Sequence, residues 1–569
     1  MSRSDRPPSR RRTGLPRRDF LVQTAAILLG LGTVPLLQSC GGQGSEPMPA
    51  PTPDTQAPAD ITFSHSVASG DPLSDRVILW TRITTTSPAA VAVDFVVATD
   101  SALGQIVRSG QVASDLSRDR TVKIDVDGLQ ENTTYYYRFS AGGVTSPVGR
   151  TKTLPAGEAG RVRMAVVSCA SLAHGFFNAY RRISERADLD LVVHLGDYIY
   201  EHGSGEFGNI RPYEPPNEIL SLSDYRTRYA QYRRDPDLQE LHRQHPMVAI
   251  WDDHEIANNA HANGAQNHTE ATEGPWAARV AAALQAYYEW MPIRVIDPAN
   301  LRKSNRTFAL GNLADLLMLE ERVNARSMQL SDDSFISPFT QSGAYTDPSR
   351  QMLGVEEESW LSEKLRSSTA KWKLIGQGTM FAQIKVRPEK NADGGGIFIN
   401  ADQWDGYQPA RDRVYDILNG DATNPAIGNV VFLSGDLHSS WAADLSQDPN
   451  NSDVNSGGYD PDTGAGARAV EFVGTSITSP ALDELEAEAA VGLEFINPHF
   501  KYIELSKRGY MLLDVDPNRV IGEWWYVDTV ANVSNVESFG RALQVQDGTS
   551  HLISAAQTLP RLNPPALAP

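Results

Sequence analysis

Five short apolar runs, each followed at once by a group able to bind a metal ion, constrain the fold of this chain more than any other feature. They are Val162–Val167 before Ser168 and Cys169, Leu191–Leu195 before Asp197, Met247–Trp251 before Asp252, Asp253 and His254, Trp372–Ile375 before Gln377, and Val430–Leu433 before Asp436 and His438. Apolar runs that alternate with helical stretches are typical of the buried strands of a layered α/β domain. Ligands bind beyond the carboxyl ends of such strands, so we expect one sheet to bring these groups together.

Asp197 and Tyr200 follow the second of these runs. Tyr200 faces the same way as Asp197 if the chain between them makes about one helical turn. A carboxylate and a phenol aimed at one point make an oxygen-rich pocket for a hard cation. The alternative is that Asp197 caps a helix and Tyr200 packs in the core. Five such endings, two of which contain His, favour a metal site over five separate helix caps.

Length and charge limit what the chain can be. With 569 residues it is too long for one hydrophobic core, so at least two domains are expected. The formal net charge is −19, and the first 39 residues contribute +5, which leaves −24 on the remainder. A body with this charge gains no electrostatic attraction to nucleic acid or to anionic membranes, so we expect no nucleic-acid partner. Any phosphate substrate would need nearby cationic groups to overcome the electrostatic repulsion of this negative charge.

Residues 1–39 have the pattern of an export signal. A basic region leads to Arg17-Arg18-Asp19-Phe20-Leu21, and the 17 residues from Leu21 to Leu37 carry no charge. The pair of arginines favours the twin-arginine (Tat) route. The alternative is a membrane anchor, but the run is short and contains Gly30, Gly32 and Pro35, which makes a poor spanning helix.

The next segment resembles a lipoprotein processing box around Cys40. In Leu37-Gln38-Ser39-Cys40-Gly41 a small residue precedes the cysteine, although Gln38 is not the small residue usual at its position. We therefore expect a lipid anchor at Cys40 and a periplasmic or cell-surface location. Residues 40–60 are rich in Pro, Ser, Gly and Ala, which indicates a flexible linker. The only other cysteine is Cys169, for which we expect a separate role and so no structural disulfide.

Residues 61–155 are predicted to form a small all-β domain. Short strand-like runs separated by turn residues occur at Val77–Arg82, Val91–Ala98, Thr121–Val126 and Thr133–Phe139. Strands at this spacing with no helical pattern between them predict a fibronectin-like β-sandwich. The small residues and breakers of Pro155–Gly160 mark a boundary, beyond which residues 160–530 form the α/β domain. For residues 531–569 we predict a C-terminal helix, from the weak helical spacing of Phe539–Leu559, followed by a disordered Pro-rich tail.

Several motifs in this order resemble the alkaline phosphatase D (PhoD) family of the calcineurin-like metallophosphoesterases. They are Ser168-Cys169, Gly196-Asp197-x-x-Tyr200, Trp251-Asp252-Asp253-His254-Glu255 and Gly435-Asp436-Leu437-His438. Outside them, Val67–Pro72, Leu79–Arg82, Trp404–Tyr407 and Asn497–His499 are also similar to the family. The resemblance extends from about Phe63 to Asp528, and several motifs together make it specific.

The resemblance implies a four-layer αββα core that holds a ferric ion, Fe(3+), and calcium, Ca(2+). Thiolate, carboxylate, phenolate and imidazole groups would hold the iron, from Cys169, Asp197, Tyr200 and His438. Asp197 would bridge to calcium, which prefers oxygen ligands such as those of Asp253 and Asp436. Gln377 would add an amide oxygen. Read without the other motifs, Cys169 is most simply a buried apolar thiol.

The function that the resemblance implies is an exported alkaline phosphatase or phosphodiesterase. Metal ions would activate a water for attack on a small phosphate ester. His254 would protonate the leaving group or hold a phosphoryl oxygen, and Arg322 would clamp the phosphate. The alternative function is a lipid-anchored binding protein with a degenerate phosphatase domain. In either case we expect a monomer.

Overall fold

The computed structural model describes residues 60–330, 337–388, 395–482 and 487–569. The predicted export signal, nearly all of the linker and Cys40 therefore lie outside the described residues. Within them the fold is mixed α/β and rich in sheet. No helix in these ranges is both long and apolar enough to span a membrane.

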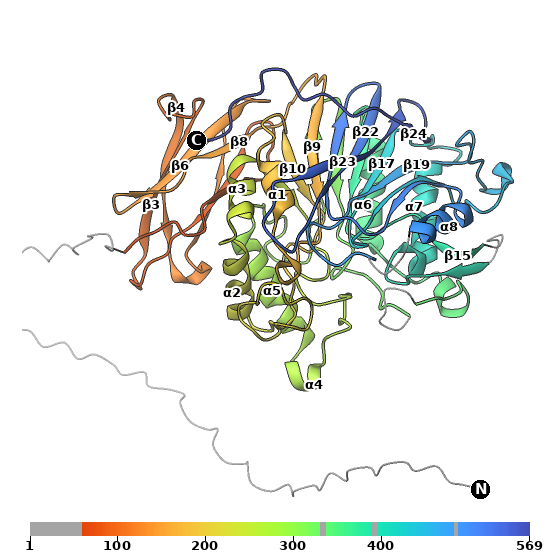
Figure 1. The fold of residues 1–569 in the computed structure, drawn as a ribbon, viewed down its shortest axis with the longest axis horizontal. Helices are drawn as coiled ribbons and strands as arrows, with labels where there is room; N and C mark the ends of the chain where they lie inside the picture. The colour runs from red at the N-terminus through yellow and green to blue at the C-terminus, as the bar shows by residue number, and fades with distance from the viewer. Residues whose placement is uncertain (1–59, 331–336, 389–394, 483–486) are drawn as a thin grey trace, which may run out of the picture. The chain divides into compact units, whose positions relative to one another are not determined.

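The largest sheet has ten strands and contains three of the five predicted runs (Figure 1). In spatial order they are β24 (Leu552–Ser554), β23 (Glu537–Gln546), β22 (Arg519–Val527), β21 (Gly509–Val515), β9 (Val162–Val167), β10 (Leu191–His194), β11 (Met247–Ala249), β1 (Val67–Gly70), β2 (Val77–Arg82) and β5 (Thr121–Val126). Strands β9, β10 and β11 are parallel neighbours, so their carboxyl ends lie at one edge.

A seven-stranded sheet contains the other two runs. Its order is β12 (Arg306–Leu310), β13 (Ala314–Met318), β14 (Trp372–Gly376), β17 (Val430–Ser434), β19 (Ala469–Val473), β18 (Ser440–Leu445) and β20 (Phe500–Glu504). The expectation that all five strand ends belong to one sheet is therefore wrong. Two sheets supply the five strand ends. The apolar pattern of a single strand does not show to which sheet the strand belongs.

Alternating faces of these strands pack into different cores. In β9, Met164 and Val166 join Leu374 of β14 in the core shared by the two sheets. Ala165 and Val167, which point the other way, pack with helices α1 (Asn178–Ser184), α2 (Leu222–Tyr232), α3 (Pro236–Gln244) and α5 (Trp276–Trp290). Because both faces of these strands are buried, their sequences are continuous apolar runs.

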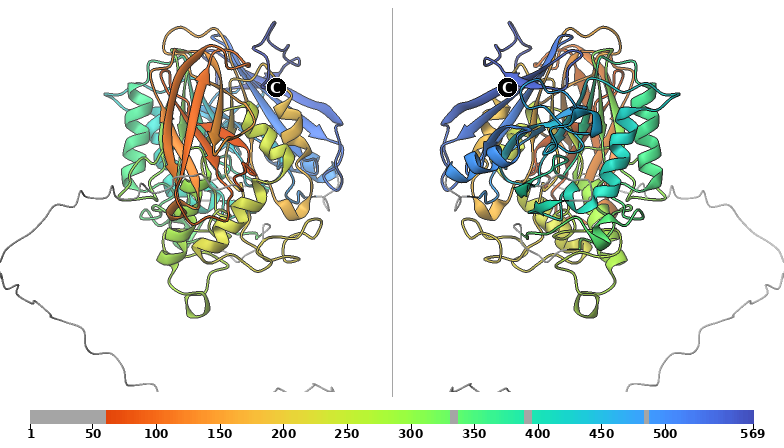
Figure 2. Two further views of the ribbon diagram at one scale, coloured as in Figure 1. Left: turned by 90° about the vertical axis from the view of Figure 1, so that its left-hand side faces the viewer. Right: turned by 90° about the vertical axis from the view of Figure 1, so that its right-hand side faces the viewer.

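The seven-stranded sheet has helices on its other face. Ile375 of β14 and Phe432 of β17 pack with α6 (Val355–Ser367) and α7 (Gln408–Asn419). Figure 2 shows α6, in green, and α1, in amber, on opposite sides of the strands. The remaining helices are α4 (Glu270–Glu273) and α8 (Ala487–Ile496), and the small sheet pairs β15 (Lys385–Pro388) with β16 (Gly396–Phe398).

The front part of the chain forms a five-stranded sheet that packs against the end of the largest one. Its strands are β4 (Ile106–Ser114), β3 (Val91–Ala98), β6 (Thr134–Ala141), β7 (Val144–Thr145) and β8 (Gly149–Lys152). One apolar cluster joins β3 and β6 to β1, β2 and β5. Since β1 pairs with β11 at Gly70 and Met247, the ten-stranded sheet runs across the predicted boundary at residues 155–160.

The predicted C-terminal helix is wrong. Residues Glu537–Gln546 and Leu552–Ser554 are strands β23 and β24 at the edge of the ten-stranded sheet. Leu543 and Val545 are buried while Gln546 is exposed, which is the two-residue period of a strand. Backbone pairing of β23 with β22 stabilises the strand more than the weak helical spacing of its apolar residues favours a helix.

The Pro-rich tail, which was predicted to be disordered, packs against the rest of the protein. Arg561 Nη1 donates to Asp190 Oδ1 at 2.6 Å, and Tyr136 Oη donates to the carbonyl of Ala566 at 2.6 Å. The backbone N–H of Ala568 donates to Gln244 Oε1 at 2.8 Å, which brings the end of the chain beside β6 and β8 (Figure 1). The sequence pattern missed these contacts because they are made with residues hundreds of positions away.

Candidate metal centre

The carboxyl ends of the two sheets meet, and this contact brings the strand-end groups together. The residue after β9, Ser168, forms a parallel bridge with Ser476, which follows β19. The backbone N–H of Gly435, after β17, donates to the carbonyl of Gly378 at 2.7 Å. Groups that follow four of the five strands, β9, β10, β11 and β17, therefore face one region, although the strands come from two sheets.

Strained backbone marks the ends of the strands. Four of the predicted site residues have the left-handed conformation, with φ of 60° at Cys169, 57° at Asp197, 59° at Asp436 and 55° at His438. Outside glycine and asparagine this conformation is uncommon, and it persists where surrounding structure holds it. Between Asp197 and Tyr200 the chain bends without forming a helical turn, and the two side chains face each other all the same.

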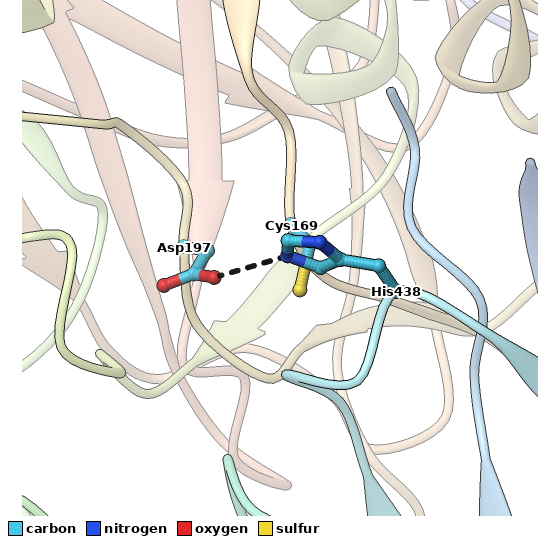
Figure 3. A group of neighbouring side chains, drawn as sticks. All are labelled: Cys169, Asp197 and His438. Atoms are coloured by element: carbon cyan, nitrogen blue, oxygen red, sulfur yellow. Dashed lines mark ion pairs between the residues drawn. The ribbon is translucent and has the colours of Figure 1, made fainter. Parts of the chain in front are cut away.

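Cys169, Asp197 and His438 form the first group, which we call the thiol cluster (Figure 3). One potential ligand atom from each lies within 4.8 Å of the others. The Nδ1 atom of His438 is 2.8 Å from the carbonyl of Pro480, so Nδ1–H donates there and Nε2 is left as the acceptor. That Nε2 atom lies 4.0 Å from Asp197 Oδ2.

The phenol of Tyr200 completes the thiol cluster. Its hydroxyl lies 3.0 Å from Asp197 Oδ2 and 3.2 Å from His438 Nε2, and it receives a 2.6 Å hydrogen bond from Ser479 Oγ. Burial, and after it the charge of Asp197, raises the pKa of the Tyr200 phenol and of the Cys169 thiol well above their usual ranges. A bound cation would reverse this effect, because it stabilises the ionised forms.

Asp252, Asp253 and Asp436 form the second group, the carboxylate cluster, again with one oxygen from each within 4.8 Å of the others. Asp197 is linked to it, since Asp197, Asp253 and His254 also lie within that distance. Asp253 Oδ2 accepts the backbone N–H of Asn259 at 2.6 Å, whereas Oδ1 is buried without a hydrogen bond. Burial raises the pKa of Asp253 to about 6, against the opposing charge of Arg322.

These features test whether the donor set suits metal ions. Buried carboxylates that raise one another's pKa are a concentration of negative charge that a cation would relieve. Oxygen atoms without hydrogen-bond partners, such as Asp253 Oδ1, are free to be ligands. Gln377, after β14, has the same feature: its Nε2 donates to the carbonyl of Thr379 at 2.8 Å, and its Oε1 is buried without a partner. The residues present therefore fit two adjacent cations.

Arg322 does not have the predicted position. It is fully buried and is not among the residues that line the cavity at the site. Its guanidinium donates to Asp252 through Nε, to Asp402 at 2.8 Å through Nη1 and to Asp436 at 2.8 Å through Nη2. Arg322 is therefore not placed in the cavity as the predicted phosphate clamp. It contacts the carboxylates of Asp252, Asp402 and Asp436 from the buried side of the site.

His254 is held by an acid that the sequence did not identify. Its Nδ1 atom lies 2.7 Å from Glu201 Oε2, and the ring packs 4.2 Å from that of Tyr200, centroid to centroid. Burial by itself would lower the pKa of His254, but the negative charges of Glu201, Asp253 and Asp197 raise it well above its usual range. The contact with Glu201 places a hydrogen on Nδ1 and favours the protonated form of the ring.

Glu255, the residue after His254 in the same motif, has a different role from Glu201. Its carboxylate accepts the backbone N–H groups of Asp197 at 3.1 Å and of Asp252 at 2.9 Å. It thereby holds the ends of β10 and β11 together. Glu201 was missed because it follows Tyr200 directly, and nothing in a linear motif says which of two acids reaches a histidine more than 50 residues away.

A cavity of about 540 Å³ opens over the two clusters. The residues of the clusters that line it are Asp197, Asp253, Asp436 and His438, and His254 lines it beside them. A small molecule can therefore reach both groups at once. The site combines buried anionic donors, an imidazole held by a carboxylate and an open cavity.

Known proteins are similar to this chain in sequence and in fold. Residues 164–524 match the family model described as PhoD-like phosphatase, and residues 48–155 match its N-terminal domain. The chain is 38% identical over 472 residues to alkaline phosphatase D of Bacillus subtilis (strain 168), which covers 80% of this chain and 76% of that protein. A solved structure of PhoD superposes with a TM-score of 0.78 and 35% sequence identity, covering 90% of this chain and 94% of that one.

Proposed function

The chain belongs to the family of PhoD-like phosphatases and hydrolyses phosphate esters, and we propose that it does so with two metal ions held by the thiol and carboxylate clusters. The observation that carries the proposal is the sharing of Asp197, whose carboxylate lies with Cys169 and His438 in one group and with Asp253 in another. A single carboxylate between two donor sets suits a pair of neighbouring cations.

We assign ferric iron to the thiol cluster and calcium to the carboxylate cluster. Thiolate and phenolate are anionic donors that stabilise a trivalent ion, and they come from Cys169 and Tyr200, with Asp197 and His438 beside them. Calcium prefers oxygen ligands, which Asp197, Asp253 and Asp436 offer. The unpartnered amide oxygen of Gln377 supports its inclusion.

The residues of the chain account for the proton that the reaction needs. When bound, the metal ions would lower the pKa of a water and neutralise the phosphoryl oxygens. His254, held protonated by Glu201, faces the cavity and donates its proton to the leaving oxygen. Hydrolysis in this way needs no covalent enzyme intermediate.

The finer description of the fold and the location of the protein are also proposals. Core contacts on both faces of both sheets support a four-layer αββα arrangement for residues 160–530. The apolar cluster of the front strands supports a sandwich within residues 61–155. The twin-arginine pattern of residues 1–39 and the sequence around Cys40 support export by the Tat route, with a lipid anchor in the periplasm or at the cell surface. We propose a monomer.

One assay tests the proposed function directly. Purified protein is given a chromogenic phosphate monoester and the matching diester, before and after treatment with a chelator. We expect hydrolysis that the chelator abolishes and that iron with calcium restores. Hydrolysis that survives complete metal removal would contradict the two-metal proposal. No hydrolysis under any metal condition would instead favour the alternative, a lipid-anchored binding protein with a degenerate domain, which the intact donor set disfavours.

A Cys169→Ser variant is expected to lose bound iron together with any visible thiolate-to-iron charge-transfer absorption. Serine keeps the size of the side chain but removes the soft anionic donor, whose sulfur is buried in the thiol cluster. Iron content by elemental analysis and the visible spectrum are the measurements. Cys40→Ser is the matched control and should retain both. Unchanged iron in Cys169→Ser would make Cys169 a packing residue.

A further inference from the structure

The cavity over the two clusters has an inner and an outer part of different chemistry. The inner part holds the carboxylates and imidazoles of the candidate metal centre. The rest of the lining, here called the outer wall, contains one carboxylate, Asp402, together with uncharged polar and apolar side chains. Its uncharged polar residues are Asn258, Asn259, His261, Gln266, Gln329 and Asn400. Among the described residues, no lysine or arginine lines this cavity.

The arginines behind the cavity do not supply the missing positive charge. Arg322 is shared among Asp252, Asp402 and Asp436. Arg326 donates to Asp402 Oδ1 at 2.5 Å and to Tyr407 Oη at 3.0 Å. Both are fully buried, and the group that they present toward the cavity is the carboxylate of Asp402. The fixed charges of the wall are therefore negative.

Hydrogen bonds hold the uncharged polar side chains of the wall in place. The side-chain amides of Asn258 and Asn259 both donate to Gln266 Oε1, at 2.6 and 2.7 Å. Gln329 Nε2 donates to Asp402 Oδ1 at 2.6 Å and to the carbonyl of Asn259 at 3.2 Å. His261 stays uncharged, since burial and the charge of Arg326 lower its pKa to about 4.

We infer that the cavity selects phosphate esters whose alcohol carries no further negative charge, and that the outer wall, whose described residues include Asp402 but no lysine or arginine, excludes esters with a second phosphate. The inference rests on the proposed function, because the metal ions neutralise the phosphoryl group that reacts. A second phosphate on the alcohol would lie beyond them, against amides and Asp402, in the field of a body whose net charge is strongly negative. Uncompensated repulsion at such a partly enclosed site lowers kcat/KM by about tenfold or more.

A matched pair of substrates tests the inference on the metal-loaded wild-type protein. Fructose 6-phosphate and fructose 1,6-bisphosphate differ by one phosphate on the same alcohol. At low ionic strength we expect kcat/KM to be at least about tenfold higher for the monophosphate, and salt to reduce this ratio because it screens the repulsion. Equal values for the two esters at low ionic strength would overturn the inference.

A charge series at Met328 tests the role of the wall. Met328 lines the cavity, and its side chain is 61% exposed, so substitution there costs the core little. We expect Met328→Lys to raise kcat/KM for the bisphosphate by about tenfold and Met328→Glu to lower it, with Met328→Gln as the neutral control. The monophosphate should change by less than about threefold in all three. Equal effects of Lys and Gln on the bisphosphate would overturn the inference.

The two proposals fail in different ways. If neither sugar phosphate nor a chromogenic monoester is hydrolysed by protein that has bound iron and calcium, the proposed function fails, and the inference fails with it. If both sugar phosphates are hydrolysed equally well, the proposed function stands and only the inference is lost.

Discussion

An Asp197→Asn variant is expected to lose about a thousandfold in kcat/KM toward a chromogenic phosphate monoester, and to lose metal from both clusters. The amide has nearly the size of the carboxylate but no charge. Asp197 is the one residue that belongs to a group with Cys169 and His438 and also to a group with Asp253. Removing its charge therefore weakens two cation sites together, which no other single substitution in the site does.

The same substitution should also lower the stability of the metal-free protein. Burial acts against ionisation of Asp197, but His254, His438 and Arg322 hold the pKa of its carboxyl well below the usual range. The ionised carboxylate therefore stabilises the folded state at neutral pH, and asparagine loses that contribution. Thermal unfolding of the chelated variant is expected at a lower temperature than that of chelated wild type, so metal content and activity are compared below both unfolding temperatures.

Asp444→Asn is the control for a buried acid away from the site. Asp444 Oδ2 accepts from Tyr459 Oη at 2.7 Å and lies 2.6 Å from His551 Nδ1, so its loss should lower thermal stability. Its metal content and kcat should remain close to wild type. An Asp197→Asn protein that kept both metals and most of its activity would refute the bridging assignment.

A His254→Ala variant is expected to retain its metal ions but to lose about 100- to 10,000-fold in kcat, the usual contribution of a general acid. The loss should be larger for an alkyl phosphate than for an aryl phosphate, because a poor leaving group depends more on protonation. The measurements are turnover on both esters and metal content of the same samples. Unchanged turnover with metal retained would remove His254 from the mechanism.

Glu201→Gln separates the proton donor from the residue that holds it. A general acid must be protonated, so activity falls as pH rises through the pKa of His254. Because Glu201 raises that pKa, the glutamine variant should lose activity at a lower pH than wild type. Glu218→Gln is the matched control, since Glu218 Oε1 binds Arg279 at 2.6 Å. The assignment to Glu201 is wrong if the alkaline limb of the pH profile is the same in all three proteins.

Much of the site was accessible from the sequence because its residues follow runs that are buried on both faces. Such runs must be continuously apolar, so their ends are visible without a structure, and Cys169, Asp197, Asp436 and His438 each follow one. The left-handed backbone at these four positions agrees with their place at sharp turns after strands. The boundaries of β9 were predicted to the residue for the same reason.

Other features depend on which distant groups meet. The sequence showed Glu201 and Glu255 as equally acidic, and packing alone put the first against His254 and the second against backbone N–H groups. Arg322 looked free to bind phosphate until the fold surrounded it with carboxylates. Residues 537–546 had a weak helical spacing that pairing with β22 outweighed.

The sequence alone determined the chemical types at the centre, the strands that present them and the resemblance to a phosphatase family, because these depend on neighbours in the chain. Only the tertiary structure decided that two sheets rather than one supply the candidate ligands, that Arg322 faces carboxylates and that no lysine or arginine among the described residues lines the cavity. Hydrogen bonds and ion pairs between residues far apart in sequence fix those properties, and no local periodicity records them.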